Sequence, residues 1–538
     1  FLAKVLPTNV AYAVNVATGH VNSNLDDSPL SDQEYDVFIA TTDEADVKLL
    51  EQHAFKQDPD VLDTWFSSWL WPFATMGWPE QTDTLKKFYP TTDLVTGPDI
   101  IFFWVARMIM AGYEYMEEMP FKNVYFTGII RDKQGRKMSK TLGNSPDPLV
   151  LIAQYGADAL RFGTMRSAPL GQDVLFDEKD VELGRNFCNK LWNACRFRQM
   201  QGSAPVPGAA ADAPPAAFEI QGEINPSLLT SDDKWILLKL DAAIREITEA
   251  LNSYNFSTAV QALYRFFWSE YCDWYVEASK AVFFSSSRRE SAQTGEGSGE
   301  GQSGLTSAAT DPRVANTLAV IDFVLSHTLR LFHPFLPFIT EELWHGMGYA
   351  ADMPENQGGK TIMNAPWPKP FEGEIRDQFS LDECYLEFAQ AKYDLVTEGR
   401  NLRRIGNIQA AKKVKFILKP VSEVIPHDAE VIKILLNAEA LEIVADYQPK
   451  KGTPTAHTKM GELFLPLEGL VDVEAERARL TKEKEKIEAE IVKVEQKLAN
   501  PAFTQKVPAT VLQEHQQRLV DWQNKLAHVK AALEALGS

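Results

Sequence analysis

The stretch from Arg131 to Asn144, RDKQGRKMSKTLGN, has residue types and spacing that suit chemistry on a phosphate. Its first ten residues contain five cations and one acid, although the whole chain has a formal net charge of -20. Gly135 and Gly143 flank the Lys-Met-Ser-Lys core and give the backbone freedom to close over a ligand. Lysine is a compact charge that can follow phosphate oxygens during phosphoryl or nucleotidyl transfer. A lone KxxK pattern is more often a solvated basic turn, so the flanking segments decide between the two interpretations.

The segments on either side of this stretch favour the phosphate interpretation. FKNVYFTG, ending at Gly128, is β-rich and apolar and predicts a buried strand. After the loop, Asp147 and Pro148 predict the cap and the first residue of a helix that stops near Gly156. A second helix is predicted to start at Asp158. A strand, a basic loop and a capped helix form the arrangement expected of a nucleotide site at the end of a parallel sheet.

A tryptophan-rich run and a predicted helix precede the loop. The run, DPDVLDTWFSSWLWPFATMGWPE, contains four tryptophans, most of which we expect in a core or a subunit contact. After a chain break at Gly97, a helix is predicted from near Asp99 to Glu117. An apolar stripe on one face of that helix is more often core than binding pocket. Its members are Ile100, Trp104 and Met108.

Three motifs, taken in order, resemble one known family. GRKMSKTLGN resembles the KMSKS loop of class I aminoacyl-tRNA synthetases, with Thr141 in the place of the usual last serine. Two further motifs, DVLDTWFSS followed by VTGPDIIFFWVARMIM, are similar to those of the valyl-tRNA synthetases in sequence and in order. Isoleucyl enzymes usually have a first block closer to DVWFDS. Pro98 departs from the aromatic residue that is common between this glycine and aspartate.

The resemblance implies a ligase that uses ATP to activate valine as valyl-adenylate and transfers it to tRNA-Val, with Mg²⁺ accompanying ATP. It implies that Lys137 and Lys140 are the catalytic residues. The implied ATP-binding residues are Gly97, Asp99, Lys137, Met138, Ser139 and Lys140. The implied valine-binding residues are Trp65, Ile100 and Trp104, completed by a wall from a more N-terminal part. No metal ligands are implied.

A second motif that class I synthetases need, of the HxGH type, is not found in this sequence. The segment Thr18–His20 lacks the first histidine, and the editing domain is not recognisable either. We therefore expect the C-terminal portion of a longer synthetase, with little or no valine activation by itself. Valine-dependent ATP–pyrophosphate exchange by the isolated chain would contradict that expectation. The alternatives are a non-catalytic tRNA-binding module and a related isoleucyl-type synthetase.

The predicted fold is multidomain. It comprises the α/β second half of a Rossmann-type class I catalytic domain, an all-α anticodon-binding bundle, a small α/β unit and a C-terminal antiparallel coiled-coil hairpin. The hairpin follows from a seven-residue repeat of Leu480, Ile487 and Val494 and a second seam near the end of the chain. The predicted divisions are 1–57, after the editing insertion; 58–182, the catalytic half; 183–380, the helical domain with insertions 201–227 and 285–310; 381–468, the α/β unit; and 469–538, a tRNA-binding arm.

Composition limits the possible partners. The acidic balance argues against nucleic-acid binding by the whole surface, so tRNA contacts must use local basic patches and be salt-sensitive. One such patch surrounds Arg400, Arg403 and Arg404, where phosphate contact and ordinary solvated charge are equally favoured. Four cysteines without a CxxC pair argue against a structural zinc and indicate a reducing, cytoplasmic location. We expect no membrane-spanning segment and a monomer.

Overall fold

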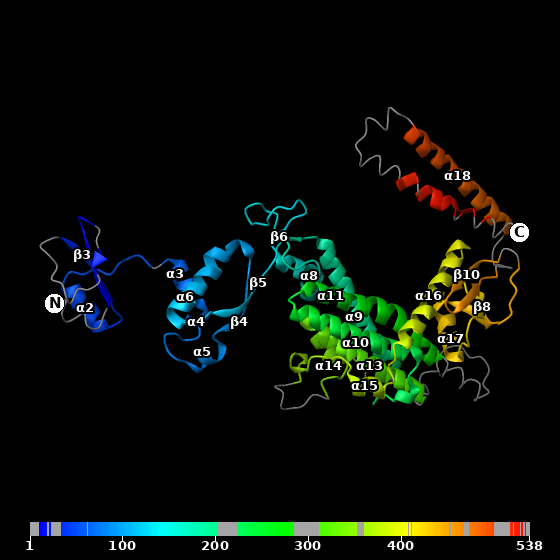
Figure 1. Cartoon of the computed structure of the whole chain (residues 1–538), viewed down its shortest axis with the longest axis horizontal. Coiled ribbons are helices and arrows are strands. Elements are labelled where there is room, and N and C mark those ends of the chain that lie inside the picture. The colour runs from blue at the N-terminus through cyan, green and yellow to red at the C-terminus, as the bar shows by residue number, and fades with distance from the viewer. Residues whose placement is uncertain are drawn as a thin grey trace. The chain divides into compact units, whose positions relative to one another are not determined.

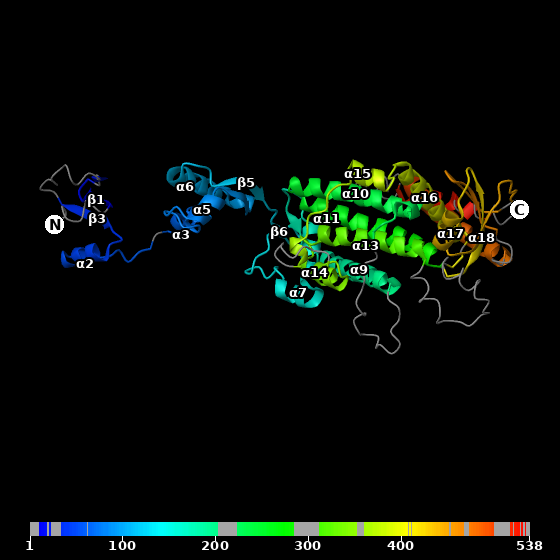
Figure 2. The ribbon, with the colours of Figure 1, turned by 90° about the horizontal axis from the view of Figure 1, so that it is seen from below.

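The structure is a computed structural model, and the chain divides into two compact units, Phe1–Tyr125 and Phe126–Ser538 (Figures 1 and 2). Each unit is described by itself. The division falls inside the stretch 58–182, which the sequence predicts as one unit, and the predicted domain boundaries stay predictions. The structure describes residues 10–18, 21–22, 34–61, 63–202, 223–284, 311–351, 360–406, 408–409, 411–450, 453–466, 473–499, 517–519, 521–527, 529–530 and 533.

The first unit begins with a small antiparallel sheet of order β2-β1-β3. Its strands are β1 (Val10–Asn15), β2 (Val21–Asn22) and β3 (Tyr35–Ala40), and they are followed by α2 (Glu44–Gln52). The carboxylate of Asp43 accepts a hydrogen bond from the Ala45 amide at 2.7 Å and caps α2. The segment EYDVFIATTDEADVKLL therefore forms a strand followed by a helix.

The rest of the first unit packs short helices against two paired strands, β4 (Thr91–Thr96) and β5 (Phe121–Phe126). The predicted helix from Asp99 to Glu117 forms as three consecutive pieces. They are a 3₁₀ turn η2 (Pro98–Ile100), a π-helical stretch η3 (Ile101–Val105) and α6 (Ala106–Met116). The remaining helices are α3 (Thr64–Ser68), α4 (Trp71–Ala74) and α5 (Asp83–Phe88).

The second unit begins with the basic loop and the helices that follow it. Two short parallel strands, β6 (Ile130–Arg131) and β7 (Val174–Leu175), flank α7 (Pro148–Tyr155) and α8 (Ala157–Arg166). Asp147 caps α7 by accepting from the Leu149 amide at 2.9 Å, and α7 ends at Gly156. The predicted cap, start and end of this helix are confirmed.

A helical bundle follows and contains the largest core (Figure 2). Apolar residues on its first helix, among them Phe187, Leu191 and Ala194, are buried. Most aromatic side chains of η5 are also buried. The helical elements are α9 (Glu178–Gly202), η4 (Pro226–Leu228), α10 (Ser231–Asn252), α11 (Phe256–Tyr264), η5 (Arg265–Tyr275), α13 (Pro312–Phe332), α14 (Pro337–Gly346), η7 (Ile362–Asn364), α15 (Gly373–Gln378) and α16 (Cys384–Ile405).

Helix α13 departs from one expectation. It is long and apolar enough to cross a membrane by length and composition, whereas the sequence was expected to hold no such segment. However, 72% of its apolar window is buried inside the bundle. Its apolarity is therefore that of a core helix, because helices that are hydrophobic on all sides also occur in the interior of large domains.

The chain then forms a small α/β unit and a long helix. The sheet has the order β10-β11-β8-β9, with β8 and β9 parallel. Its elements are β8 (Val414–Pro420), α17 (Pro426–Leu435), β9 (Ala438–Ile443), β10 (Thr455–Thr458) and β11 (Gly461–Phe464).

The long helix, α18 (Val473–Ala499), packs with the described helical residues of 517–533. Ile487, Ile491 and Val529 are buried in this contact. The side chain of Leu480, the turn near 501–508, and Leu512 lie outside the described residues. The predicted insertion 285–310 also lies outside them, as does most of 201–227, although η4 lies at the end of the latter range.

Candidate functional site

A single buried carboxylate organises the basic loop. Oδ1 of Asp132 accepts from the amides of Gln134 and Arg136 at 3.0 and 2.9 Å. Oδ2 accepts from the side-chain amide of Asn144 at 2.9 Å and from Nε of Arg136 at 2.8 Å. These bonds, with that from Asn144 the largest contribution, hold the pKa of Asp132 well below its usual range. The carboxylate therefore stays charged and fixes both ends of the loop.

Asn144 also holds the lysine-containing turn. Its Oδ1 accepts from the Ser139 amide at 2.9 Å, and Oγ of Ser139 accepts from the Leu142 amide at 3.2 Å. Gly135 and Gly143 have φ angles of +78° and +62°, in the left-handed region that residues with a side chain seldom adopt. The turn is thus built by local hydrogen bonds and two glycines.

Ion pairs hold the cations Arg131, Lys133 and Arg136 of this loop. Arg131 pairs with Asp173, Lys133 with Asp177 at 3.0 Å, and Arg136 with Asp132 at 2.7 Å. The side chains of Lys137 and Lys140 are exposed, while Met138 and Ser139 are half-buried. The loop therefore presents its two central lysines to solvent on a braced backbone, which suits contact with an anionic group.

The valine-binding residues implied by the resemblance come partly together in the first unit. The rings of Trp65 and Trp104 stack with centroids 6.3 Å apart and an interplanar angle of 19°. Both are half-buried, and Asp63 caps the short helix that carries Trp65 by accepting from its amide at 2.8 Å. Trp104 lies in the π-helical stretch η3, a geometry found often at functional sites.

The other implied residues of this unit lie at the start of the same helix. Gly97 precedes η2, Asp99 is exposed within its first turn, and Ile100 is half-buried at its end. The loop residues belong to the second unit and these residues to the first. The structure thus places the ring of Trp65 beside that of Trp104. It also places Lys137 and Lys140 in the same turn.

Sequence reasoning missed several residues that shape these regions. Asp132 and Asn144 brace the loop, and Arg107 places its guanidinium 4.0 Å from the centre of the Trp65 ring, a cation–π contact. Arg107 could have been noticed as the lone cation in the apolar run IIFFWVARMIM. The turn at Asp132 is indicated in the sequence by Gly135, which follows the aspartate closely. The hydrogen bond between Asp132 and Asn144 spans twelve residues, so no local sequence pattern indicates it.

Helix α8 attaches the loop region to the bundle. The buried carboxylate of Asp158 accepts from the amides of Ile339 at 2.7 Å and Phe338 at 3.4 Å, at the start of α14. Arg161 donates to the carbonyl oxygens of Pro334 and Phe335 at 2.9 and 3.2 Å. Asp158 therefore caps a helix other than its own, a role that its position in the sequence did not indicate.

The patch around Arg400 and Arg403 resolves into structural contacts. Arg403 is buried and donates to the carbonyl oxygens of Leu436 at 2.9 Å and Asn437 at 3.2 Å. Arg400 donates to the carbonyl oxygen of Leu435 at 3.0 Å. These two arginines cap the end of α17, so Arg403 is not a solvated charge, whereas Arg400 is exposed. Arg404 is exposed.

Across the residues that the structure describes, no group of three or more His, Cys, Asp or Glu side chains is placed to hold a metal ion. The four cysteines have free thiols, of which only that of Cys384 is exposed.

Comparisons with known proteins cover most of the chain. Residues 14–177 match the family "tRNA synthetases class I (I, L, M and V)". Residues 233–418 match "Anticodon-binding domain of tRNA ligase", and residues 472–537 match "Valyl tRNA synthetase tRNA binding arm". The three matches follow one another in chain order, as the resemblance requires.

Curated relatives agree with these families. A valine–tRNA ligase of Thermotoga maritima is 40% identical over 481 residues, covering 89% of this chain and 49% of the relative. That of Carboxydothermus hydrogenoformans is 40% identical, covering 86% and 47%. That of Chlorobaculum tepidum is 36% identical, covering 94% and 52%. The chain thus spans about half the length of the curated relatives it matches.

Solved structures are more distant. A ternary complex of Agrobacterium radiobacter K84 LeuRS, tRNA and LeuAMS is 18% identical with a TM-score of 0.41, covering 68% of this chain and 41% of that one. Mycobacterium tuberculosis methionyl-tRNA synthetase with methionyl-adenylate is also 18% identical, with a TM-score of 0.38, covering 67% and 76%. At these scores the assignment depends on the sequence matches alone, and by those matches the chain belongs to the valyl-tRNA synthetase family of class I aminoacyl-tRNA synthetases.

Proposed function

We propose that this chain supplies the KMSKS loop, part of the valine pocket and the tRNA-binding parts of a valine–tRNA ligase. The observation that carries the proposal is the braced loop, in which Asp132 and Asn144 hold the backbone while Lys137 and Lys140 remain exposed. The match to valine–tRNA ligases over about nine-tenths of the chain identifies the reaction to which such a loop belongs.

The proposed reaction has two steps. A carboxylate oxygen of valine attacks the α-phosphorus of Mg-ATP, the bond from that phosphorus to the β-phosphate bridging oxygen breaks, and pyrophosphate leaves. A hydroxyl of the terminal tRNA ribose then attacks the carbonyl carbon of valyl-adenylate, and AMP leaves. Neither step needs a side-chain nucleophile, so positioning and charge stabilisation supply the rate.

In this proposal the loop acts on the departing phosphates. Lys137 and Lys140 neutralise charge that accumulates on pyrophosphate as the bond breaks, and Mg²⁺ arrives with ATP as part of the substrate. The backbone of Met138 and Ser139 contacts ATP beside the two lysines. Gly97 and Asp99 approach the ribose and adenine of ATP. The two lysines are the catalytic residues of the proposal.

The stacked tryptophans form the proposed wall for the amino acid side chain. Trp65, Trp104 and Ile100 present an apolar surface that suits the branched side chain of valine. An apolar pocket discriminates poorly against threonine, which has nearly the same shape, a weakness known for this enzyme class. Selection by this wall alone is therefore incomplete, and we propose that the complete enzyme corrects such errors by editing.

The remaining parts are proposed to hold tRNA-Val. The bundle matches an anticodon-binding domain, and residues 472–537 match a tRNA-binding arm. We propose that this arm is an antiparallel two-helix coiled coil, which the burial of Ile487, Ile491 and Val529 between α18 and the following helical residues supports. We further propose a monomer that acts in the cytoplasm, consistent with the absence of a CxxC pair from the sequence.

Two binding measurements on the chain test the proposal. First, filter binding should show tighter association with tRNA-Val than with tRNA-Ile at the same salt concentration. Second, Mg-ATP should protect Lys137 and Lys140 from acetylation by acetic anhydride, read by mass spectrometry. Lys133, which lies in the same loop but pairs with Asp177, is the matched control and should react equally with and without ATP.

The outcomes separate the proposal from its alternative. Binding of tRNA-Val without ATP protection of either lysine would indicate a tRNA-binding module without activation chemistry. Equal binding of both tRNAs would contradict the assignment to valine.

A further inference from the structure

A cavity of about 660 Å³ opens where the helical bundle meets the small α/β unit. One wall belongs to the bundle and comes mostly from η4 and the first residues of α10, α13 and α16. The other wall belongs to the α/β unit and comes from the start of α17 and the segment before it. Cavities of this volume bind small molecules. None of the loop or tryptophan residues described above lines it, so it is separate from the proposed substrate contacts.

The charged side chains of the cavity divide between its two walls. The bundle wall carries the cations Lys234 and Arg313, and the wall of the α/β unit carries the acids Glu423 and Asp428. Arg313 is exposed and has no carboxylate partner among the described residues. The ammonium of Lys234 lies 3.0 Å from the hydroxyl of Tyr385, which is a neutral partner. A cavity with one positive and one negative wall matches a ligand that carries both charges.

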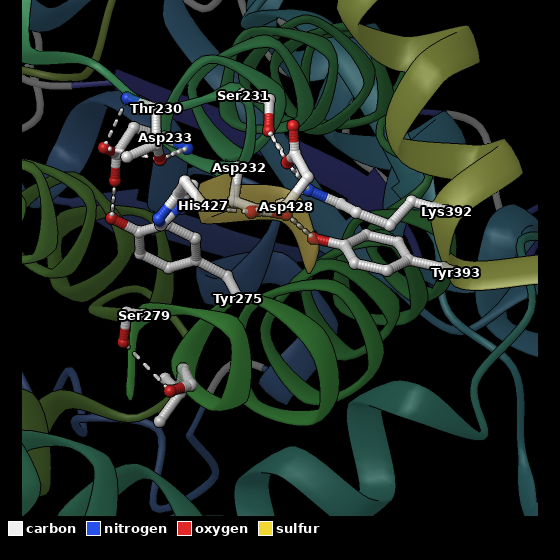
Figure 3. Close-up of polar contacts among 11 residues, drawn as sticks. Thr230, Ser231, Asp232, Asp233, Tyr275, Ser279, Lys392, Tyr393, His427 and Asp428 are labelled. Carbon is white, nitrogen blue, oxygen red and sulfur yellow. Dashed lines mark hydrogen bonds and ion pairs between the residues drawn. The ribbon is translucent and has the colours of Figure 1, made fainter. Parts of the chain in front are cut away.

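A buried network fixes the negative wall (Figure 3). Lys392, fully buried on α16, donates to Asp232 and Asp428 at 2.8 Å each. Ser231 donates to Asp428 at 2.7 Å, so this carboxylate is held by two groups. Two carboxylates share one ammonium, and His427, 4.0 Å from Asp232, adds positive charge only when it is protonated. The network therefore carries excess negative charge, which reaches the cavity at Asp428, and it is formed before a ligand binds.

Apolar side chains line the rest of the cavity. Phe388, on α16, is half-buried and adds aromatic surface. Leu228 and Val282 of the bundle and Ile425 of the α/β unit add aliphatic surface. Covering these side chains with the hydrocarbon part of a ligand is favourable in proportion to the apolar area removed from water. The lining therefore favours a ligand that combines two opposite charges with a large apolar group.

We infer that this cavity binds a free amino acid with a large apolar side chain. The carboxylate of the amino acid contacts Arg313 and Lys234 on one wall, and its ammonium contacts Asp428 and Glu423 on the other. Its side chain lies against Phe388, so the bound molecule joins the bundle to the α/β unit. The inference goes beyond the proposed function, because this ligand is neither the tRNA nor the valine and ATP assigned to the other sites.

Cys384 offers a local measurement because its exposed thiol lines the cavity. Cys195 and Cys272 are buried and Cys188 is half-buried, so iodoacetamide should modify Cys384 first. Tryptophan is the probe, because it has the largest apolar side chain among the amino acids. Saturating tryptophan should slow the modification of Cys384 at least about tenfold, as for a group covered by a bound ligand.

Three related molecules separate the contributions of charge and apolar surface. Tryptamine lacks the carboxylate of tryptophan, indole-3-propionate lacks its ammonium, and alanine keeps both charges but lacks the ring. Each should need at least about a tenfold higher concentration than tryptophan to protect half of the Cys384 thiol. The reason is that each loses either a charged hydrogen bond or the buried apolar surface.

Two variants at exposed lining positions assign the charges to their walls. Arg313→Gln should raise the half-protecting concentration of tryptophan about tenfold without raising that of tryptamine, which has no carboxylate. Glu423→Gln should raise the concentration for tryptophan without raising that for indole-3-propionate, which has no ammonium. Glu387→Gln, at an exposed acid of α16 outside the lining, is the control and should change each concentration less than about twofold.

The outcomes decide the inference separately from the proposed function. The inference is wrong if tryptophan does not protect Cys384, or if tryptamine or indole-3-propionate protects it at the same concentration as tryptophan. It is also wrong if either variant weakens protection by all the indole compounds equally. Protection of Lys137 by Mg-ATP is read on the same chain and tests the proposed function alone. Circular dichroism identifies a misfolded variant, in which case the comparison of the four molecules on the unmodified chain decides.

Discussion

Two lysines of the second unit, Lys140 and Lys392, have opposite surroundings. Lys140 lies in the basic loop with an exposed side chain, on a turn held by Asp132 and Asn144. Lys392 is fully buried, with two carboxylates and a hydroxyl within 3.1 Å of its ammonium. The lysine side chain is thus exposed to solvent at position 140, whereas at position 392 it is buried among its ion-pair and hydrogen-bond partners.

The comparison shows how acids are used in each region. Around Lys392 the carboxylates of Asp232 and Asp428 face the ammonium directly, and although burial lowers the pKa of Lys392, these charges raise it overall. In the loop, the oxygens of Asp132 accept hydrogen bonds from backbone amides and from the side chains of Asn144 and Arg136. The exposed lysines of the loop are therefore positioned through their backbone, and the buried Lys392 through its charge.

Removing the buried ammonium should have the largest effect on stability. In Lys392→Met, Asp232 and Asp428 would remain buried without a counter-charge, so we expect a loss of about 3–5 kcal/mol in the free energy of unfolding. Urea unfolding followed by far-ultraviolet circular dichroism measures this loss. The control is Lys433→Met, because Lys433 pairs with Glu430 at a half-buried position on α17 that water still reaches, and should contribute about 1 kcal/mol or less. A loss below about 1 kcal/mol for Lys392→Met would contradict the role given to the network.

Acid should weaken the bundle through His327, the next largest effect. Burial first, and then Arg330, lowers the pKa of His327 to about 3, while its ring packs on Phe323 at 4.2 Å. In the unfolded chain this histidine becomes protonated near pH 6.5, whereas in the folded chain it stays neutral down to about pH 3. The free energy of unfolding should therefore fall as the pH falls from about 6.5 to about 3, by up to about 1.4 kcal/mol per pH unit.

His327→Phe removes this titration and should flatten that part of the stability curve. It also removes the bond from Nδ1 to the Phe323 carbonyl, so its stability at pH 7 should be lower by about 1 kcal/mol. His457→Phe, at an exposed position on β10, should keep the slope of the unmodified chain. Identical slopes for His327→Phe and the unmodified chain between pH 7 and pH 4 would contradict the assignment.

The loop brace should give a smaller and more local effect. Asn144→Ala removes the bonds to the Ser139 amide and to Asp132, each of which contributes about 1 kcal/mol. We expect amide hydrogen exchange in residues 137–144 to become at least about tenfold faster, measured by mass spectrometry. Gln134→Ala is the control, since its side chain makes only a 3.4 Å contact with Arg136. Unchanged exchange in Asn144→Ala would show that the loop is held by other contacts.

The features that were predicted from the sequence are those that depend on residues close together in the chain. Asp147 and Pro148 begin α7, and Gly156 ends it, because helix caps depend on a few neighbouring residues. The helix after Gly97 was also placed correctly, but its π-helical stretch at Ile101–Val105 was not expected, since single-sequence patterns assume a uniform helical period. The order of the three motifs was enough to identify the family.

The features that could not be predicted depend on partners far away in the chain. Lys392 contacts Asp232, 160 residues earlier, and Asp158 caps α14, about 180 residues later. Arg403 was one of a cluster of cations in the sequence, yet its hydrogen bonds go to carbonyl oxygens at the end of α17. Charge pattern alone does not distinguish a solvated cation from a buried one, because burial is decided by the tertiary fold.

Replacing Lys140 should have the smallest effect on stability and the clearest effect on ligand binding. Its side chain is exposed, so Lys140→Ala should change the free energy of unfolding by less than about 0.5 kcal/mol. Removing one charged contact to the phosphates should weaken Mg-ATP binding by about 1.5–3 kcal/mol, at least tenfold. The measurement is the ATP concentration that half-protects Lys137 from acetylation. Lys133→Ala, which breaks only the surface pair with Asp177, should leave that concentration unchanged within about twofold. If both variants shift it equally, the loop would be acting through its general positive charge and not through Lys140 in particular.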